Sequence, residues 1–188
     1  VHMVHLTLAE NAYHSFGLDE VLMLPNGDPP HKTDKIITPA VHRLAMLQRA
    51  VEGIPYFRIS DMEIRRKGYS YSSVTLEELK KAHPDTDYYF IMGADSLFQI
   101  ETWHEPAVIM ADCVILAAMR NHTPDDVFKK QMDYLEAKYH ADIRFLNIPD
   151  LALSSSEIRR RVSEHQSIRF MVPEGVREYI EEHQLYCR

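Results

Sequence analysis

The sequence predicts an α/β fold, a doubly wound parallel sheet, from three observations. Short apolar runs alternate along the chain with longer segments of helical periodicity. The runs at residues 88–92 (YYFIM) and 113–117 (CVILA) are almost wholly apolar, as is typical of strands buried on both faces of a parallel sheet. No internal repeat or interdomain linker interrupts the pattern, so we expect one domain over residues 1–188.

Turn and capping residues bound the expected elements. Gly17 ends the first helix, Thr38 caps the second with Pro39 at its first position, and Pro84 ends the third. We expect helices at residues 5–16, 39–51, 124–139, 155–164 and 173–183, and a further helix that starts at Ser72 or Ser73 and ends before Pro84. We expect strands at residues 20–24, 56–62, 88–92, 113–117 and 143–146.

Two of these elements have particular consequences. In the second helix we expect Val41, Leu44, Ala45 and Val51 to form the buried face. The first helix has no strand before it, whereas a sheet of this kind normally opens with a strand and a glycine-rich turn. We therefore expect that native residues precede Val1, and that their strand lies between those at 20–24 and 88–92.

Composition excludes several classes of function. With 45% hydrophobic residues and only two cysteines, the chain can build a core without disulfides, which favours a reducing, cytoplasmic setting. We expect neither a signal peptide nor a membrane span, since the sequence shows no pattern of the first kind and no apolar run long enough for the second. A net charge of -7 argues against nucleic-acid binding, while a small anionic ligand needs only a few local cations.

Two basic segments are candidate phosphate sites. His2 and His5 share one face at the start of a helix, whose N–H groups and dipole favour anions. The alternative is a pair of surface histidines, and a zinc site is disfavoured because no third ligand is nearby. In the loop at residues 25–38, two prolines precede His31 and Lys32, which could grip a phosphate; the alternative is an ordinary solvated loop.

Polar residues at the later strand-to-helix junctions extend the candidate site. Gly93 would allow close approach of a ligand. Asp95 could accept hydrogen bonds from ribose hydroxyls or simply be a helix N-cap, and the two roles are compatible. Ser154 and Glu157 have capping-box spacing. That box leaves Ser155, Ser156 and Arg159 unexplained, and these three suit a polyphosphate, although the Glu157 carboxylate works against an anion.

Aromatic residues supply the last candidates. Trp103, the only tryptophan, is either a core residue or a ring-stacking platform. Tyr71 and Ser72 offer hydroxyls at a helix start.

Taken in order, these segments resemble the nicotinate-nucleotide adenylyltransferase family of the nucleotidyltransferase superfamily. The series His-x-x-His, PPHK, SYS, GAD, Trp, LSSSEIR spans essentially the whole chain. The HxGH and ISSTxIR motifs mark the superfamily, and PPHK with the Tyr-Thr and Trp-aromatic positions narrows the resemblance to this family. It implies a Rossmann-like nucleotidyltransferase fold.

The resemblance also implies roles for individual residues. The ATP-contacting segments correspond to His2, His5, Gly93, Asp95, Ser155, Ser156 and Arg159. Positions for the mononucleotide phosphate, pyridine carboxylate and ring correspond to His31, Lys32, Tyr71, Ser72, Trp103 and His104. We expect His2, His5 and Arg159 to be catalytic.

The sequence departs from the family pattern at several positions. Val4 replaces the glycine between the histidines, and serine replaces threonine at Ser72 and Ser156. His104 replaces the aromatic residue after Trp103, and the first strand with its glycine-rich turn is absent. If Val4 faces the ligand, Val4→Gly should improve ATP handling; if it faces the sheet, it adds apolar packing.

The implied reaction is adenylyl transfer from ATP to nicotinate mononucleotide, which yields deamido-NAD and pyrophosphate in NAD biosynthesis. Mg²⁺ is expected to arrive with ATP. The rival functions are a related adenylyltransferase acting on nicotinamide mononucleotide or phosphopantetheine, and a catalytically silent nucleotide-binding protein. ATP and the mononucleotide are the expected partners, and a homo-oligomer stays open.

Overall fold

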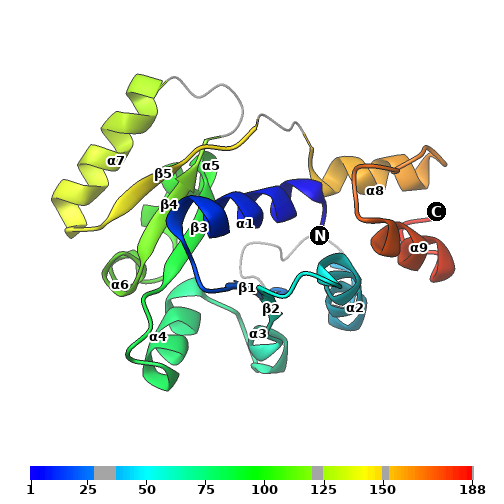
Figure 1. Ribbon diagram of the computed structural model, residues 1–188, viewed down its shortest axis with the longest axis horizontal. Coiled ribbons are helices and arrows are strands. Elements are labelled where there is room, and N and C mark those ends of the chain that lie inside the picture. Colours follow the sequence, from blue (N-terminus) through cyan, green and yellow to red (C-terminus); the bar gives the residue numbers. More distant parts are fainter. Residues whose placement is uncertain (28–36, 120–124, 150–152, 188) are drawn as a thin grey trace. The chain divides into compact units, whose positions relative to one another are not determined.

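The computed structural model describes residues 1–27, 37–119, 125–149 and 153–187. The chain divides into two compact units. One comprises Val1–Gly68 and Leu151–Arg188, and the other comprises Tyr69–Asp150. Figure 1 labels the elements of both.

The first unit holds a two-stranded parallel sheet. Strand β1 (Val21–Met23) pairs with β2 (Phe57–Ile59), with Val21 opposite Phe57. Apolar side chains of β1, β2 and the helices form its core. The helices of this unit are α1 (Met3–Phe16), α2 (Ala40–Val51), α3 (Met62–Arg65), α8 (Ser155–Ser163) and α9 (Glu174–Glu182).

The second unit holds a three-stranded parallel sheet in the order β3-β4-β5, visible side by side in Figure 1. The strands are β3 (Tyr89–Gly93), β4 (Val114–Ala118) and β5 (Ile143–Leu146). The other elements are α4 (Ser72–Ala82), α5 (Ala94–Gln99), the 3₁₀ turn η1 (Ile100–Thr102), α6 (Pro106–Asp112) and α7 (Asp125–Tyr139). Ile115 and Ala117 of β4 are fully buried, which confirms that the apolar run is a central strand.

The parallel α/β architecture confirms the predicted fold class, with one difference in the sheet. Within the described ranges, β1 pairs only with β2, and β3 pairs only with β4, so the strands form two sheets. All strand pairs are parallel, and helices connect successive strands.

The buried face of α2 differs from the predicted one. Val41 is 67% exposed, and the face instead passes through Met46, Leu47 and Ala50 before reaching Val51. The predicted stripe placed Val41 inside because its spacing to Leu44 is helical, but α2 meets α9 through His42 and Arg49, which contact Tyr179 and Glu182. Thr38 is not the cap either: Pro39 precedes the first helical residue, and the Thr38 hydroxyl bonds to Tyr186.

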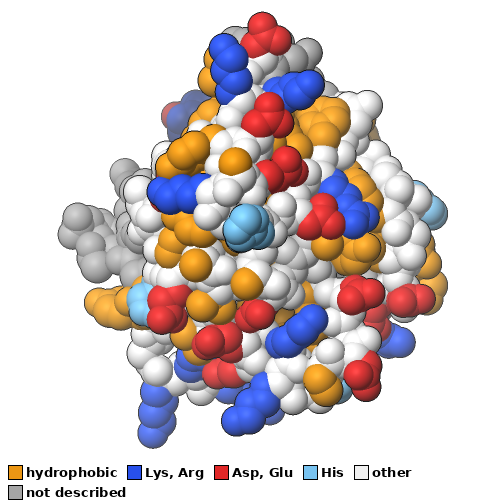
Figure 2. Space-filling view, turned by 90° about the vertical axis from the view of Figure 1, so that its left-hand side faces the viewer, with side chains coloured by type: hydrophobic (Ala, Val, Ile, Leu, Met, Phe, Trp, Pro, Cys, Tyr) orange, Lys and Arg blue, Asp and Glu red, His pale blue; other side chains and the backbone are white. Residues whose placement is uncertain are grey.

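Surface charge agrees with the negative net charge. On the face drawn in Figure 2, Lys and Arg side chains lie among Asp and Glu side chains rather than in one basic patch. In the part of the chain that the structure describes, no helix is both long and apolar enough to cross a membrane.

Candidate active site

The two N-terminal histidines lie in contact at the start of α1. His2 precedes the first helical residue, and its backbone N–H donates to His5 Nδ1 at 3.3 Å. The ring centroids are 3.8 Å apart. His2 is buried and His5 is exposed, so the His5 imidazole is presented to solvent at the positive end of a helix.

Val4, between the two histidines, is a core residue. Its side chain is only 1% exposed in the first unit. A side chain so enclosed does not face bound phosphates, so the packing alternative fits the structure. The buried position of Val4 therefore counts against the expectation that Val4→Gly improves the KM for ATP and kcat.

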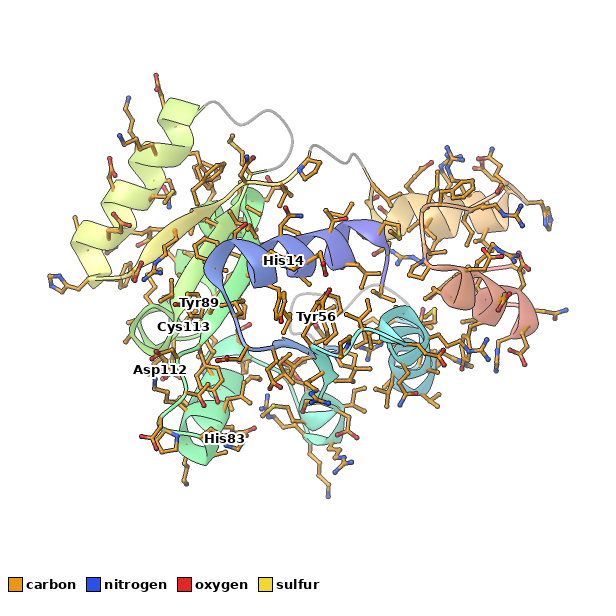
Figure 3. The ribbon with its side chains drawn as sticks, in the orientation of Figure 1. His14, Tyr56, His83, Tyr89, Asp112 and Cys113 are labelled. Carbon is orange, nitrogen blue, oxygen red and sulfur yellow. The ribbon has the colours of Figure 1, made fainter. Side chains whose placement is uncertain are left out.

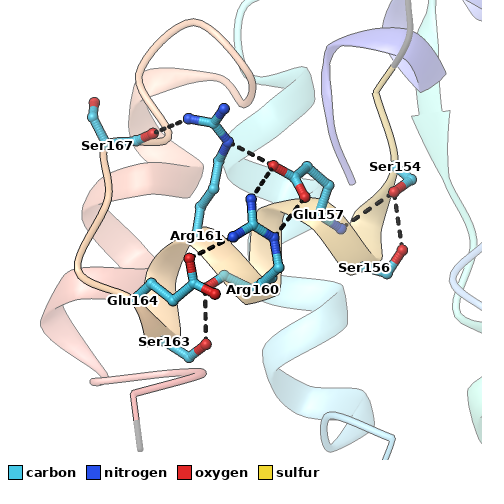
Figure 4. A network of polar contacts seen from close by, with 8 residues as sticks. All are labelled: Ser154, Ser156, Glu157, Arg160, Arg161, Ser163, Glu164 and Ser167. Atoms are coloured by element: carbon cyan, nitrogen blue, oxygen red, sulfur yellow. Dashed lines mark hydrogen bonds and ion pairs between the residues drawn. The ribbon is translucent and has the colours of Figure 1, made fainter.

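The serine-rich segment forms the start of α8, shown in Figure 4. Ser154 Oγ accepts a hydrogen bond from the Glu157 N–H at 3.2 Å, as the capping-box spacing predicts. Ser154 and Ser156 hydroxyls lie 2.9 Å apart. The reciprocal bond of the box is not formed, because Glu157 turns to two arginines instead.

Those arginines change the electrostatics of the turn. Glu157 accepts from Arg160 Nη2 at 2.7 Å and from Arg161 Nε at 2.9 Å. Charge-assisted bonds of this kind are stronger than the bond to a neutral N–H. Arg160 first, and then Arg161, lower the pKa of Glu157 to about 2. The negative charge of Glu157, which would repel an anion, is therefore balanced by two arginines of the same helix.

Arg159 differs from its two neighbours. Its side chain is exposed, and none of the described residues holds it in a hydrogen bond or ion pair. Arg159 and Arg43 both lie close enough to Val1, just before α1, to exert a positive potential there. The start of α1 therefore lies in the positive field of both guanidinium groups, an arrangement that favours an anion there.

The second unit brings together the start of α4 and the turn after η1. Tyr71 precedes α4, and its ring stacks on His104, with centroids 4.2 Å apart. Ser72 is the first residue of the helix, and the side chain of the N-cap residue Tyr71 makes no capping hydrogen bond. Trp103 is partly buried against the core and meets Phe90 edge-on at 6.3 Å, so it packs on the core through part of its ring.

Gly93 and Asp95 lie at the carboxyl end of β3. Gly93 is the last residue of the strand and precedes the first residue of α5. Asp95 lies in the first turn of α5, so the alternative that it is the N-cap is wrong. Its carboxylate is exposed and lies where the helix dipole favours negative charge. His31 and Lys32 lie outside the described residues.

Comparison with known proteins assigns the family. A family model described as cytidylyltransferase-like matches residues 1–161. A Lachnoclostridium phytofermentans protein named "Probable nicotinate-nucleotide adenylyltransferase" is 42% identical over 186 residues, 99% of this chain and 93% of that protein. A Salinibacter ruber protein of the same name is 40% identical over 185 residues, 98% of this chain and 91% of that protein. This chain belongs to the nicotinate-nucleotide adenylyltransferase family.

A solved structure confirms the fold of this adenylyltransferase family. Plasmodium falciparum nicotinic acid mononucleotide adenylyltransferase, complexed with NaAD, matches with a TM-score of 0.80 and 20% sequence identity. The match covers 99% of this chain and 91% of that chain. The predicted Rossmann-like nucleotidyltransferase fold is therefore confirmed.

Arg43 is a feature of this adenylyltransferase chain that sequence reasoning missed. From α2 its guanidinium donates to Thr38 O at 3.0 Å, to Gly27 O at 3.4 Å and to Asn26 O. It thus bonds to both ends of the segment that carries the PPHK motif. No sequence pattern predicts such a contact, because the partners are backbone carbonyls 5, 16 and 17 residues away from Arg43.

A cavity at the amino ends of the strands of the second sheet is a weaker candidate for a ligand site. About 390 Å³ in volume, it is lined by Tyr89, Asp112 and Cys113 near the amino ends of β3 and β4 (Figure 3). In sheets of this family's type, ligands bind at the carboxyl ends. Two of its charged residues, Asp142 and Arg144, pair with each other at 2.7 Å, and burial raises the pKa of the Cys113 thiol to about 12. Among the described residues, no group of three or more His, Cys, Asp or Glu side chains could hold a metal ion.

Proposed function

We propose that this chain transfers the adenylyl group of ATP to nicotinate mononucleotide, forming deamido-NAD and pyrophosphate. The observation that carries the proposal is about 40% identity, over nearly the whole chain, to proteins named for this activity. Residues 1–188 would act as one nucleotidyltransferase domain in the cytoplasm.

The chemistry requires alignment rather than a general base. An oxygen of the mononucleotide phosphate attacks the α-phosphorus of ATP, a new P–O bond forms, and the bond from the α-phosphorus to the leaving pyrophosphate oxygen breaks. The nucleophile is already an anion, so no proton must be removed. What the protein must supply is the positioning of two anions and neutralisation of charge at the reacting phosphates.

We assign the ATP phosphates to the first unit. His5 and Arg159 are exposed cation-type donors, and the start of α8 adds N–H groups and hydroxyls. His2 supports the His5 ring through the contact described above. Mg²⁺ would come as the ATP complex, because this ion keeps its waters and binds largely through substrate phosphates. The proposed ATP phosphate ligands are His2, His5, Ser155, Ser156 and Arg159.

We assign the adenosine and the pyridine to the second unit. Asp95, with Gly93, would receive the ribose hydroxyls, because its carboxylate is exposed at the end of β3. The uncapped first turn of α4, at Tyr71 and Ser72, would donate N–H groups to the pyridine carboxylate. Trp103 and His104 complete this pocket, and His31 and Lys32 would bind the mononucleotide phosphate.

Acceptor preference tests the proposed function. A nicotinate carboxylate can accept two N–H bonds, whereas a nicotinamide would turn its NH₂ toward the same donors. An unpaired buried polar group costs about 1–3 kcal/mol, so we expect kcat/KM for nicotinate mononucleotide to exceed that for the nicotinamide form by about 5- to 150-fold. Dinucleotide and pyrophosphate formation with each acceptor, and with phosphopantetheine, would be measured side by side. Equal kcat/KM values, or ATP binding without product, would refute the proposal.

Arg43→Lys tests the role of the guanidinium that bonds to both ends of the PPHK segment. Lysine keeps the charge but cannot donate to three carbonyls in fixed directions. We expect the KM for nicotinate mononucleotide to rise about tenfold, equivalent to about 1.4 kcal/mol, and the KM for ATP to change much less. Arg49→Lys, on the same helix but paired with Glu182, is the matched control. Equal changes in both KM values would show that Arg43 stabilises the first unit as a whole rather than the binding of nicotinate mononucleotide.

A further inference from the structure

A buried hydroxyl at the start of α4 bonds to the histidine after Trp103. Ser73 is fully buried, and its Oγ lies 3.2 Å from His104 Nδ1. The His104 ring also stacks on Tyr71, with an interplanar angle of 24°. Three side chains from two separate segments of the second unit therefore form one contact cluster.

The imidazole nitrogen that faces Ser73 also lies near a carboxylate. The same Nδ1 lies 3.3 Å from Glu105 Oε2 as well as 3.2 Å from Ser73 Oγ. Depending on the tautomer, Nδ1 either donates to Ser73 Oγ or accepts from the Ser73 hydroxyl. In both cases the bond ties the His104 ring to the start of α4.

The bond joins two backbone segments that must keep a fixed separation. One is the uncapped first turn of α4, and the other is the turn after η1, which begins with Trp103 N–H donating to Ile100 O at 3.0 Å. Glu105 in that turn has a φ of 48°, a left-handed conformation that residues other than glycine hold only when their surroundings enforce it. His104, bonded to buried Ser73, is a residue that can enforce it.

We propose that Ser73 and His104 are positioning residues that set the width of the pyridine-carboxylate pocket and thereby its preference for nicotinate over nicotinamide. The inference rests on the proposed function. His104 acts through its side-chain bond to Ser73, not as a platform on which the pyridine stacks. One face of its ring is already covered by Tyr71, and its Nδ1 edge is engaged with Ser73.

Three variants separate this role from a stacking role. Ser73→Ala removes the partner, His104→Phe keeps an aromatic ring but loses the bond, and His104→Asn keeps a donor near the Nδ1 position. We expect Ser73→Ala and His104→Phe each to raise the KM for nicotinate mononucleotide about tenfold, with kcat and the KM for ATP changing less than about threefold. Selectivity over the nicotinamide form should fall by the same factor, and His104→Asn should recover part of it. The double variant should lose no more than either single variant, because both remove one bond.

The controls separate positioning from loss of structure. Thr75→Val removes another buried hydroxyl of α4 and should alter thermal stability without altering acceptor selectivity. If Ser73→Ala does not fold, Ser73→Cys provides the same test with a weaker hydrogen-bonding group of similar size. Thermal melting of every variant accompanies the kinetics.

Several results would overturn the proposal. A His104→Phe enzyme with an unchanged or lower KM for nicotinate mononucleotide would mean that the ring stacks on the substrate. An unchanged KM for nicotinate mononucleotide in Ser73→Ala, or additive losses in the double variant, would mean that the Ser73–His104 bond does not set the width of the pocket. If the wild type forms no dinucleotide, the proposed function fails, and calorimetric Kd values for nicotinate mononucleotide with the wild type and variants still decide this inference.

Discussion

His5→Ala and Arg159→Ala should each lower kcat by about 10²–10³ while leaving the free energy of unfolding nearly unchanged. Both side chains are exposed, so neither contributes much buried area to the first unit. Removal of one preorganised donor from developing phosphate charge costs rate because no water replaces it in the same position. Product formation under saturating ATP and nicotinate mononucleotide would be measured together with chemical denaturation.

Arg160→Ala is the matched control for Arg159→Ala. The two arginines are adjacent on α8, but Arg160 is bonded to Glu157 and Glu164 and is not available to a ligand. We expect its removal to change kcat less than about threefold, because Arg161 still pairs with Glu157 and exposed ion pairs contribute little. If Arg159→Ala and Arg160→Ala lost activity equally, the loss would reflect general charge rather than a specific phosphate contact. Near-normal rates in both His5→Ala and Arg159→Ala would favour a silent nucleotide-binding protein.

Local signals in the sequence predicted the elements well where one residue decides a boundary. Gly17 ends α1 with a φ of 59°, and α4 ends before Pro84. The apolar runs at residues 88–92 and 113–117 correspond to β3 and β4, each of which lies one residue later than predicted. The short elements α3, α5, η1 and α6 were not predicted, because three to seven residues are too few to show a helical period.

Around the candidate site, the sequence predicted short-range contacts but not those that depend on packing. Spacing alone placed His2 beside His5 and put Ser154 at a helix cap, since both relations are local. Spacing could not reveal that Glu157 is neutralised by Arg160 and Arg161, or that Arg43 bonds to both ends of the PPHK segment. Those contacts depend on which side-chain rotamers the packed helices allow, and several of them cross between segments. The role of each site residue stays a prediction.

Val4→Gly should destabilise the protein by about 3 kcal/mol, and its effect on ATP handling should be secondary. Burying a valine side chain contributes about 1.5–3 kcal/mol, and glycine costs up to about 1 kcal/mol more within a helix. Val4 is 1% exposed and is the second residue of α1, so both contributions apply. For a chain of this size the loss corresponds to a fall in Tm of about 6–12 °C.

Two further variants divide the loss between packing and backbone. Val4→Ala removes most of the buried side chain but keeps a good helix former. It should therefore lose about 2 kcal/mol of stability from packing, without the backbone cost of glycine. Met3→Gly, at the exposed neighbouring position, should show mainly the backbone cost. The measurement is thermal and chemical denaturation of all three variants, with the KM for ATP determined well below each Tm. A Val4→Gly protein that melts within about 2 °C of the wild type and binds ATP more tightly would show that the valine side chain faces the nucleotide. Such a result would restore the expectation that a glycine between the two histidines serves the phosphates, and it would count against the buried position of Val4.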